Sequence, residues 1–160
     1  MRVWRICAYR MRKTAFSGRG AFDNPGRWNS EGHLAVYCAE SRALAAMEIL
    51  VHVENKRRLR KARFVAIPAE IPDHLICRPG RFPRDWDAVP PHDTTRRLGD
   101  EMLDGPQFPA LRVPSAVVHG EFCFVLNPAH PLYGQIVLGD PEPFRFDERI
   151  ATVDVPARKP

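Results

Sequence analysis

The sequence lacks the patterns that mark a membrane protein or an exported one. No apolar run approaches the roughly 20 residues that a membrane-spanning helix needs. Residues 1–13 carry several Arg and Lys side chains but no apolar stretch, so they do not resemble a secretory signal. We therefore expect a soluble protein that stays in the cytoplasm.

Common metal-binding and catalytic patterns are also missing. The four cysteines are widely spaced and form no C-x-x-C pair, which favours free, buried thiols over a zinc site or disulfides. The six histidines show no H-E-x-x-H spacing, and no serine stands in a nucleophile elbow. The glycines form neither a G-x-G-x-x-G nor a Walker pattern. We expect no metal ion and no recycled redox cofactor.

The length and charge of the chain suit one domain with anionic partners. Its 160 residues fit a single core, and we assign 1–155 to that domain and 156–160 to a flexible tail. The net charge is +5, with the densest basic cluster at residues 56–63. We interpret this cluster as a solvated helix end. The alternative is a non-catalytic module that binds nucleic acid or an acidic protein, but the cluster lacks the interleaved aromatic residues typical of nucleic-acid contact.

Hydrophobic patterning predicts strands near both ends of the chain, with helices inserted between them. The expected helices cover 42–56, with Ser41 as N-cap, and 94–103, with Asp93 as cap. Residues 16–32 and 72–92 have the composition of loops, and Pro68 favours an edge or end position for its strand. The pattern is not a regular βαβ alternation, so we predict an α+β domain with a mostly antiparallel sheet. The expected strands are 3–9, 34–38, 63–71, 111–113, 116–118, 122–126, 135–138 and 144–146.

Glu48 is the most informative residue of the chain. It is the only ionisable side chain in the segment 43–51, which otherwise has the composition of a buried helix. An uncompensated carboxylate in apolar surroundings costs several kcal/mol. A fold tolerates that cost when the group is paired, hydrogen-bonded or retained for chemistry, so Glu48 is our first candidate for a catalytic residue.

Four further motifs surround Glu48 in the sequence. Gly26-Arg27-Trp28-Asn29 and a strand with Tyr37 precede it, and Val113-Pro114-Ser115 and Asn127-Pro128 follow it. With these motifs in this order, the chain resembles the RES-domain family, the toxin half of bacterial type II toxin–antitoxin pairs. The resemblance extends from Arg5, a less distinctive match in the first strand, to about residue 131.

The resemblance implies a fold like that of ADP-ribosyltransferases, with NAD as a substrate that is cleaved. By motif, it implies catalytic roles for Arg27, Glu48 and Ser115, and NAD binding by Arg5, Arg27, Tyr37 and Ser115. It also implies a partner, an antitoxin with an Xre-like helix-turn-helix. We expect the two proteins to form a hetero-oligomer in which the antitoxin blocks the NAD cleft and the basic surface helps to recruit it.

The same residue types suit this chemistry on physical grounds. Breaking the nicotinamide–ribose bond builds positive charge on the sugar, which a fixed carboxylate such as Glu48 stabilises. The guanidinium groups of Arg5 and Arg27 match phosphate oxygens. Tyr37 offers a flat face to nicotinamide or its ribose, and the Ser115 hydroxyl can position a carboxylate or amide.

The sequence leaves the acceptor of the cleaved group open. Phosphate would make the protein an NAD phosphorylase, water a glycohydrolase, and a protein side chain a mono-ADP-ribosyltransferase. We favour NAD degradation because no segment stands out as a docking loop for a protein substrate. Trp28 is expected to pack rather than bind, Asn127 to organise a turn, and His119 and His130 to serve turns or core.

Overall fold

The computed structural model of the chain describes residues 1–53, 56, 59 and 62–152. The strands of these residues are β1 (Arg2–Ala8), β2 (Val36–Ala39), β3 (Phe64–Glu70), β4 (Ile76–Cys77), β5 (Ala110–Pro114), β6 (Phe122–Leu126), β7 (Val137–Leu138) and β8 (Glu142–Phe144). The helices are α1 (Arg19–Asp23), α2 (Arg42–His52) and α4 (Asp93–Asp104). Short 3-10 turns cover Tyr9–Met11, Asp73–Leu75, Tyr133–Gln135 and Glu148–Thr152.

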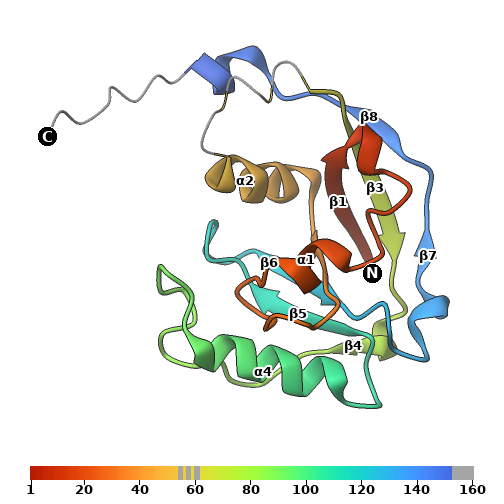
Figure 1. Cartoon of the computed structure of the whole chain (residues 1–160), viewed down its shortest axis with the longest axis vertical. Helices are drawn as coiled ribbons and strands as arrows, with labels where there is room; N and C mark the ends of the chain where they lie inside the picture. The colour runs from red at the N-terminus through yellow and green to blue at the C-terminus, as the bar shows by residue number, and fades with distance from the viewer. Residues whose placement is uncertain (54–55, 57–58, 60–61, 153–160) are drawn as a thin grey trace, which may run out of the picture.

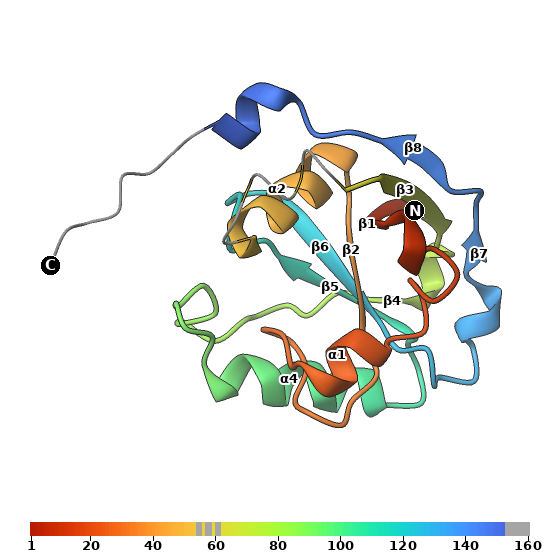
Figure 2. The same ribbon diagram turned by 45° about the horizontal axis from the view of Figure 1, so that its top comes forward.

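The strands form one curled sheet of order β4-β5-β6-β2-β1-β3-β7, and β8 also pairs with β3 (Figure 1). Only the β4–β5 pair is parallel among the described strands. In both views β5 runs between α2 and α4, which lie on opposite sides of it (Figure 2). The prediction of a single α+β domain with a mostly antiparallel sheet is confirmed.

Two main clusters of buried side chains cover the two faces of the sheet. Along β1, Ile6 packs in the first cluster, which also holds residues of α2 and α4, whereas Val3 packs in the second. This division follows from the alternation of side chains along a strand. On β2, Tyr37 and Ala39 face the first cluster, and Val36 and Cys38 face the second. The first cluster therefore defines the face on which the candidate site is built.

Helix α2 begins where its sequence predicts. The Ser41 hydroxyl accepts a hydrogen bond from the Leu44 amide at 3.0 Å, which satisfies one free N–H of the first turn. The helix ends at His52, four residues before the predicted boundary. Helix α4 starts at Asp93 itself, so His92 is the N-cap residue and the prediction that Asp93 caps the helix is wrong by one position.

Several predicted elements differ from the structure. Strand β3 lies inside the sheet, between β1 and the pair β7 and β8, and not at an edge. Pro68 is tolerated there because it falls between the β8 pairing, which ends at Ala66, and the β7 pairing, which begins at Ala69. The loop predicted at 16–32 contains α1, and the strand predicted at 116–118 is a bend. The loop at 72–92 includes β4.

Other expectations concern the cysteines, the basic cluster and the C-terminal tail. All four cysteines are free thiols, as predicted, but only Cys38 and Cys123 are buried, whereas Cys7 and Cys77 are half-buried. Residues 57, 58, 60 and 61 of the basic cluster at 56–63 lie outside the described residues, as does the tail at 156–160. No described helix has the length and apolar character needed to cross a membrane.

Candidate active site

The structure brings Glu48 and Ser115 into direct contact, although they are 67 positions apart in the sequence. The Ser115 hydroxyl donates a hydrogen bond to Oε1 of Glu48 at 2.8 Å. Glu48 lies on α2 and is partly buried, and Ser115, at the end of β5, is only 1% exposed. The contact joins two of the three predicted catalytic residues and gives the carboxylate a fixed orientation.

The Ser115 hydroxyl is fully occupied by protein groups. Its oxygen accepts hydrogen bonds from the backbone amides of Val117 and Val118, at 3.1 and 3.0 Å. A serine hydroxyl has one donor and two acceptor positions, and all three are used here. This arrangement bends the chain after β5, which explains why 116–118 is not a strand. It suits Ser115 for positioning Glu48 rather than for contacting a ligand.

Cys123 is a neighbour of Glu48 that the sequence reasoning missed. Its thiol, on β6, lies 3.3 Å from the same Oε1 atom and acts as a hydrogen-bond donor. Burial raises the pKa of Cys123, and the negative charge and hydrogen bond of Glu48 raise it further, so the thiol keeps its proton at neutral pH. The strand alternation that turns Cys123 toward α2 was visible in the sequence, but its partner was not.

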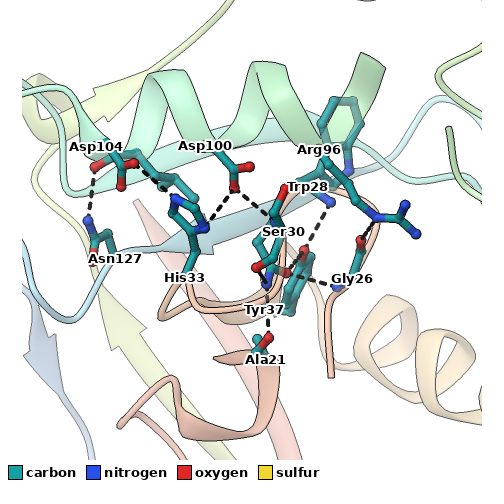
Figure 3. A network of polar contacts seen from close by, with 12 residues as sticks. Ala21, Gly26, Trp28, Ser30, His33, Tyr37, Arg96, Asp100, Asp104 and Asn127 are labelled. Atoms are coloured by element: carbon teal, nitrogen blue, oxygen red, sulfur yellow. Dashed lines mark hydrogen bonds and ion pairs between the residues drawn. The ribbon is translucent and has the colours of Figure 1, made fainter. Parts of the chain in front are cut away.

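Tyr37 links the sheet to the loop that carries Arg27 (Figure 3). Its hydroxyl donates to Oδ1 of Asn29 at 2.7 Å and accepts a hydrogen bond from the Trp28 amide at 3.1 Å. Burial raises the pKa of Tyr37, so the phenol remains a donor. A side chain on Gly26 would meet the Tyr37 hydroxyl at 2.4 Å, which explains the glycine at that position. Trp28 is buried at 2% exposure, as expected for a packing residue.

The Arg27 guanidinium is held by the turn that precedes α4. Its Nη1 atom donates to the backbone carbonyls of Trp86 and Ala88, at 2.7 and 2.8 Å. Burial lowers the pKa of Arg27, while the negative charges of Asp87 and Glu48 oppose this effect. Arg27 therefore lies within electrostatic reach of Glu48. Its Nε and Nη2 atoms have no hydrogen-bond partner within the part of the chain that the structure describes.

Arg5 contacts the backbone of Tyr37 but does not lie on the face of the sheet that carries Glu48. Arg5 shares a face of β1 with Val3 and Cys7, which pack on the opposite side of the sheet from the cluster beneath α2. Its Nη1 atom donates to the Tyr37 carbonyl at 2.8 Å, where β1 and β2 pair at only one position. The geometry gives Arg5 a role in joining two strands, because backbone pairing there is incomplete.

Other predicted roles can be placed directly. Oδ1 of Asn127 accepts from the Ala129 amide at 2.9 Å and organises a turn, as expected. His130 is buried and accepts from the Leu132 amide in the same turn. His119 is exposed, and the centroid of its ring lies 5.6 Å from the centroid of the Trp86 ring. No group of metal-binding side chains occurs among the described residues.

Comparison with known proteins identifies the class of this protein. The RES domain pattern matches residues 2–147, which is most of the chain. The chain therefore belongs to the RES-domain family, and it is a toxin of that family.

The relatives include proteins of similar length. The chain is 34% identical over 152 residues to "Toxin Res" of Yersinia enterocolitica, covering 94% of this chain and 99% of that one. It is 36% identical over 135 residues to "Prs ADP-ribosylating toxin" of a Sphingobium species, covering 80% and 83%.

A solved structure supports the fold independently. The chain resembles a chain of the M. tuberculosis MbcT–MbcA toxin–antitoxin complex with a TM-score of 0.69 at 19% identity. The match covers 90% of this chain and 84% of that one. The resemblance shows that the two chains share the same arrangement of sheet and helices.

Proposed function

We propose that this protein is the toxin of a type II toxin–antitoxin pair and acts in the cytoplasm by cleaving the nicotinamide–ribose bond of NAD. The observation that carries the proposal is the Glu48 carboxylate, oriented by Ser115 and lying within electrostatic reach of Arg27. NAD is then a substrate and not a cofactor. No metal ion is needed.

Glu48 supplies the electrostatic part of the reaction. As the C–N bond breaks, its electron pair leaves with nicotinamide, and positive charge develops on the ribose. Ser115 and Cys123 both donate to Oε1 of Glu48. No group in the described part of the chain donates to Oε2, so this oxygen is available to the ribose. Nicotinamide carries positive charge in NAD and leaves as a neutral molecule, so no general acid is required to expel it.

Arg27 supplies the binding part. Two of its donors orient the guanidinium on backbone carbonyls, and Nε and Nη2 can then bind the pyrophosphate of NAD. Tyr37 holds the backbone of the Arg27 loop through its hydroxyl, and in this proposal Tyr37, which is half-buried, contacts nicotinamide. In this proposal Arg5 supports the Tyr37 strand from the far face of the sheet.

Three acceptors remain open for the ADP-ribosyl group. Water would yield ADP-ribose, and phosphate would yield its 1-phosphate. A second candidate function, transfer to a protein, is favoured by one observation, which is the similarity to a relative named as an ADP-ribosylating toxin. The alternative of a non-catalytic basic module does not explain why the partly buried Glu48 carboxylate receives hydrogen bonds from both Ser115 and Cys123.

An antitoxin is the proposed partner. The solved neighbour is part of a toxin–antitoxin complex, which supports a partner of this kind for the present chain. We propose that the antitoxin carries a helix-turn-helix and blocks access to Glu48. Saturating antitoxin should then abolish NAD turnover, and unchanged turnover would contradict the blocking model.

The direct test is incubation of purified protein with NAD, with nicotinamide release followed by chromatography. Wild-type protein should release nicotinamide, and Glu48→Gln should lose at least about 100-fold in rate because a neutral amide stabilises the ribose cation poorly. Glu31→Gln, at an exposed position, is the matched control and should retain wild-type rate. Product masses with and without phosphate distinguish the acceptors, and a labelled protein band would identify transfer. Full activity of folded Glu48→Gln would exclude the proposed role of Glu48.

A further inference from the structure

We propose that helix α4 is the positioning element for Arg27 and fixes this residue at both ends, through its backbone and through its guanidinium. The inference rests on the proposed function, because it assigns residues that act on NAD only through Arg27. Asp100 is the central positioning residue.

The backbone of the Arg27 loop is fastened to one side of α4 (Figure 3). The Ser30 amide donates to Oδ1 of Asp100 at 2.9 Å, and Nε of Arg96 donates to the Gly26 carbonyl at 3.2 Å. These two contacts lie on either side of Arg27 in the sequence. Because residues 24–35 form no helix or strand, such contacts replace the regular hydrogen bonds that would otherwise fix this backbone.

Gly99 brings the helix and the loop into backbone contact between those two hydrogen bonds. A Cβ atom placed on Gly99 would lie 2.0 Å from the Trp28 carbonyl oxygen, so only glycine allows this approach. The three contacts come from Arg96, Gly99 and Asp100. Gly99 and Asp100 follow Arg96 by three and four positions, so all three residues lie on one face of the helix.

The guanidinium end is fastened to the start of the same helix. The carbonyls that receive Nη1 of Arg27 belong to a turn at residues 83–88, in which the Ala88 amide donates to the Asp85 carbonyl at 3.1 Å. The Asp85 carboxylate accepts from the Thr94 hydroxyl at 3.3 Å and lies 3.1 Å from Nδ1 of His92. The turn that orients the guanidinium is thus tied to the first residues of α4.

This arrangement has a functional consequence. A binding group held within about 0.5 Å of its working position loses little entropy when the ligand arrives, whereas a displacement of about 1 Å can cost about 100-fold in rate. Helix α4 contributes no predicted NAD contact of its own. In this proposal its effect on NAD passes through Arg27.

The test compares Asp100→Ala with Asp100→Asn and with Glu101→Ala. Glu101 is the next residue of α4 and is exposed, which makes it the matched control. NAD affinity is measured by calorimetry in a Glu48→Gln background, where the nucleotide is not consumed. Asp100→Ala should weaken NAD binding by about tenfold, because a charge-assisted hydrogen bond to the loop is lost. Asp100→Asn should stay within about threefold, since its amide oxygen can still accept from Ser30, and Glu101→Ala should show no change.

A double-mutant cycle separates positioning from general stability. In an Arg27→Ala background, Asp100→Ala should have no further effect on NAD affinity, because nothing remains for it to position. An equal loss in both backgrounds, or no loss in either, would overturn the proposal. Asp85→Ala provides a second variant with the same expected pattern, in case Asp100→Ala does not fold.

The outcomes also distinguish this inference from the function on which it rests. If wild-type protein neither binds nor cleaves NAD, the proposed function fails. If wild-type protein binds NAD and Asp100→Ala binds it equally well, the function stands and the role of α4 is refuted.

Discussion

Replacing Ser115 with alanine tests the link between the hydroxyl and Glu48. The substitution removes one oxygen atom and leaves the backbone of β5 in place. Glu48 loses the hydroxyl that donates to it at 2.8 Å, and the amides of Val117 and Val118 lose the oxygen that accepts from both of them. We expect both the stability of the turn and the orientation of the carboxylate to suffer.

The size of the effect follows from these three hydrogen bonds. Two are neutral and contribute about 0.5–1.5 kcal/mol each, and the third, to a carboxylate, contributes about 1.5–3 kcal/mol. Water can replace part of this loss at Glu48, which is only partly buried. We therefore expect the free energy of unfolding to fall by about 2–4 kcal/mol. A carboxylate displaced by about 1 Å should lower NAD turnover by about 10- to 100-fold.

The assays are urea unfolding followed by fluorescence and initial rates of nicotinamide release. Ser17→Ala is the control, since the Ser17 hydroxyl is exposed and bonds only its own turn. It should change the unfolding free energy by less than about 0.5 kcal/mol and leave turnover intact. If folded Ser115→Ala turned over NAD at the wild-type rate, the proposed role of Ser115 in orienting Glu48 would be refuted.

Three further predictions concern binding, packing and pH. Arg27→Lys should raise the KM for NAD about tenfold, because an ammonium cannot bond two carbonyls and a phosphate with fixed geometry; an unchanged KM would show that the fork is not needed. Gly99→Ala should cost about 3 kcal/mol or more in unfolding free energy, whereas Gly20→Ala, with open space around it, should be neutral; equal melting temperatures would contradict the close contact with Trp28. Burial raises the pKa of Cys38 from 9.0 to about 12, so stability is complete below about pH 9 and declines by up to about 4 kcal/mol as the pH rises to about 12. Over this pH range the free energy of unfolding of Cys38→Ala should decline less steeply than that of the wild type. An identical decline would show that ionisation of Cys38 does not cause the loss of stability.

Local patterns in the sequence predicted local structure well. Ser41 caps α2, and α4 begins and ends within one residue of its predicted bounds, because capping residues and helical periodicity act over a few neighbouring positions. Prediction was poorer where a side chain overrides strand propensity. The apolar residues 116–118 form a bend, since the amides of Val117 and Val118 bond Ser115 rather than another strand.

The candidate site was predictable in its residue types but not in its geometry. The odd carboxylate in an apolar helix singled out Glu48, and motif order added Arg27, Tyr37 and Ser115. The partners of Cys123 and Asp100 could not be predicted from the sequence, because each lies about 70 residues away in the chain.

The sequence by itself therefore determined helices α2 and α4, the type of sheet, the free cysteines and the residue types available for chemistry. Tertiary structure decided which of those residues meet. It set Arg5 on the far face of the sheet from Glu48, because a strand directs alternate side chains to opposite faces and only the completed sheet shows what covers each face. It also gave Glu48 its hydroxyl and thiol donors, since hydrogen bonds form by distance in space and not by separation in the chain.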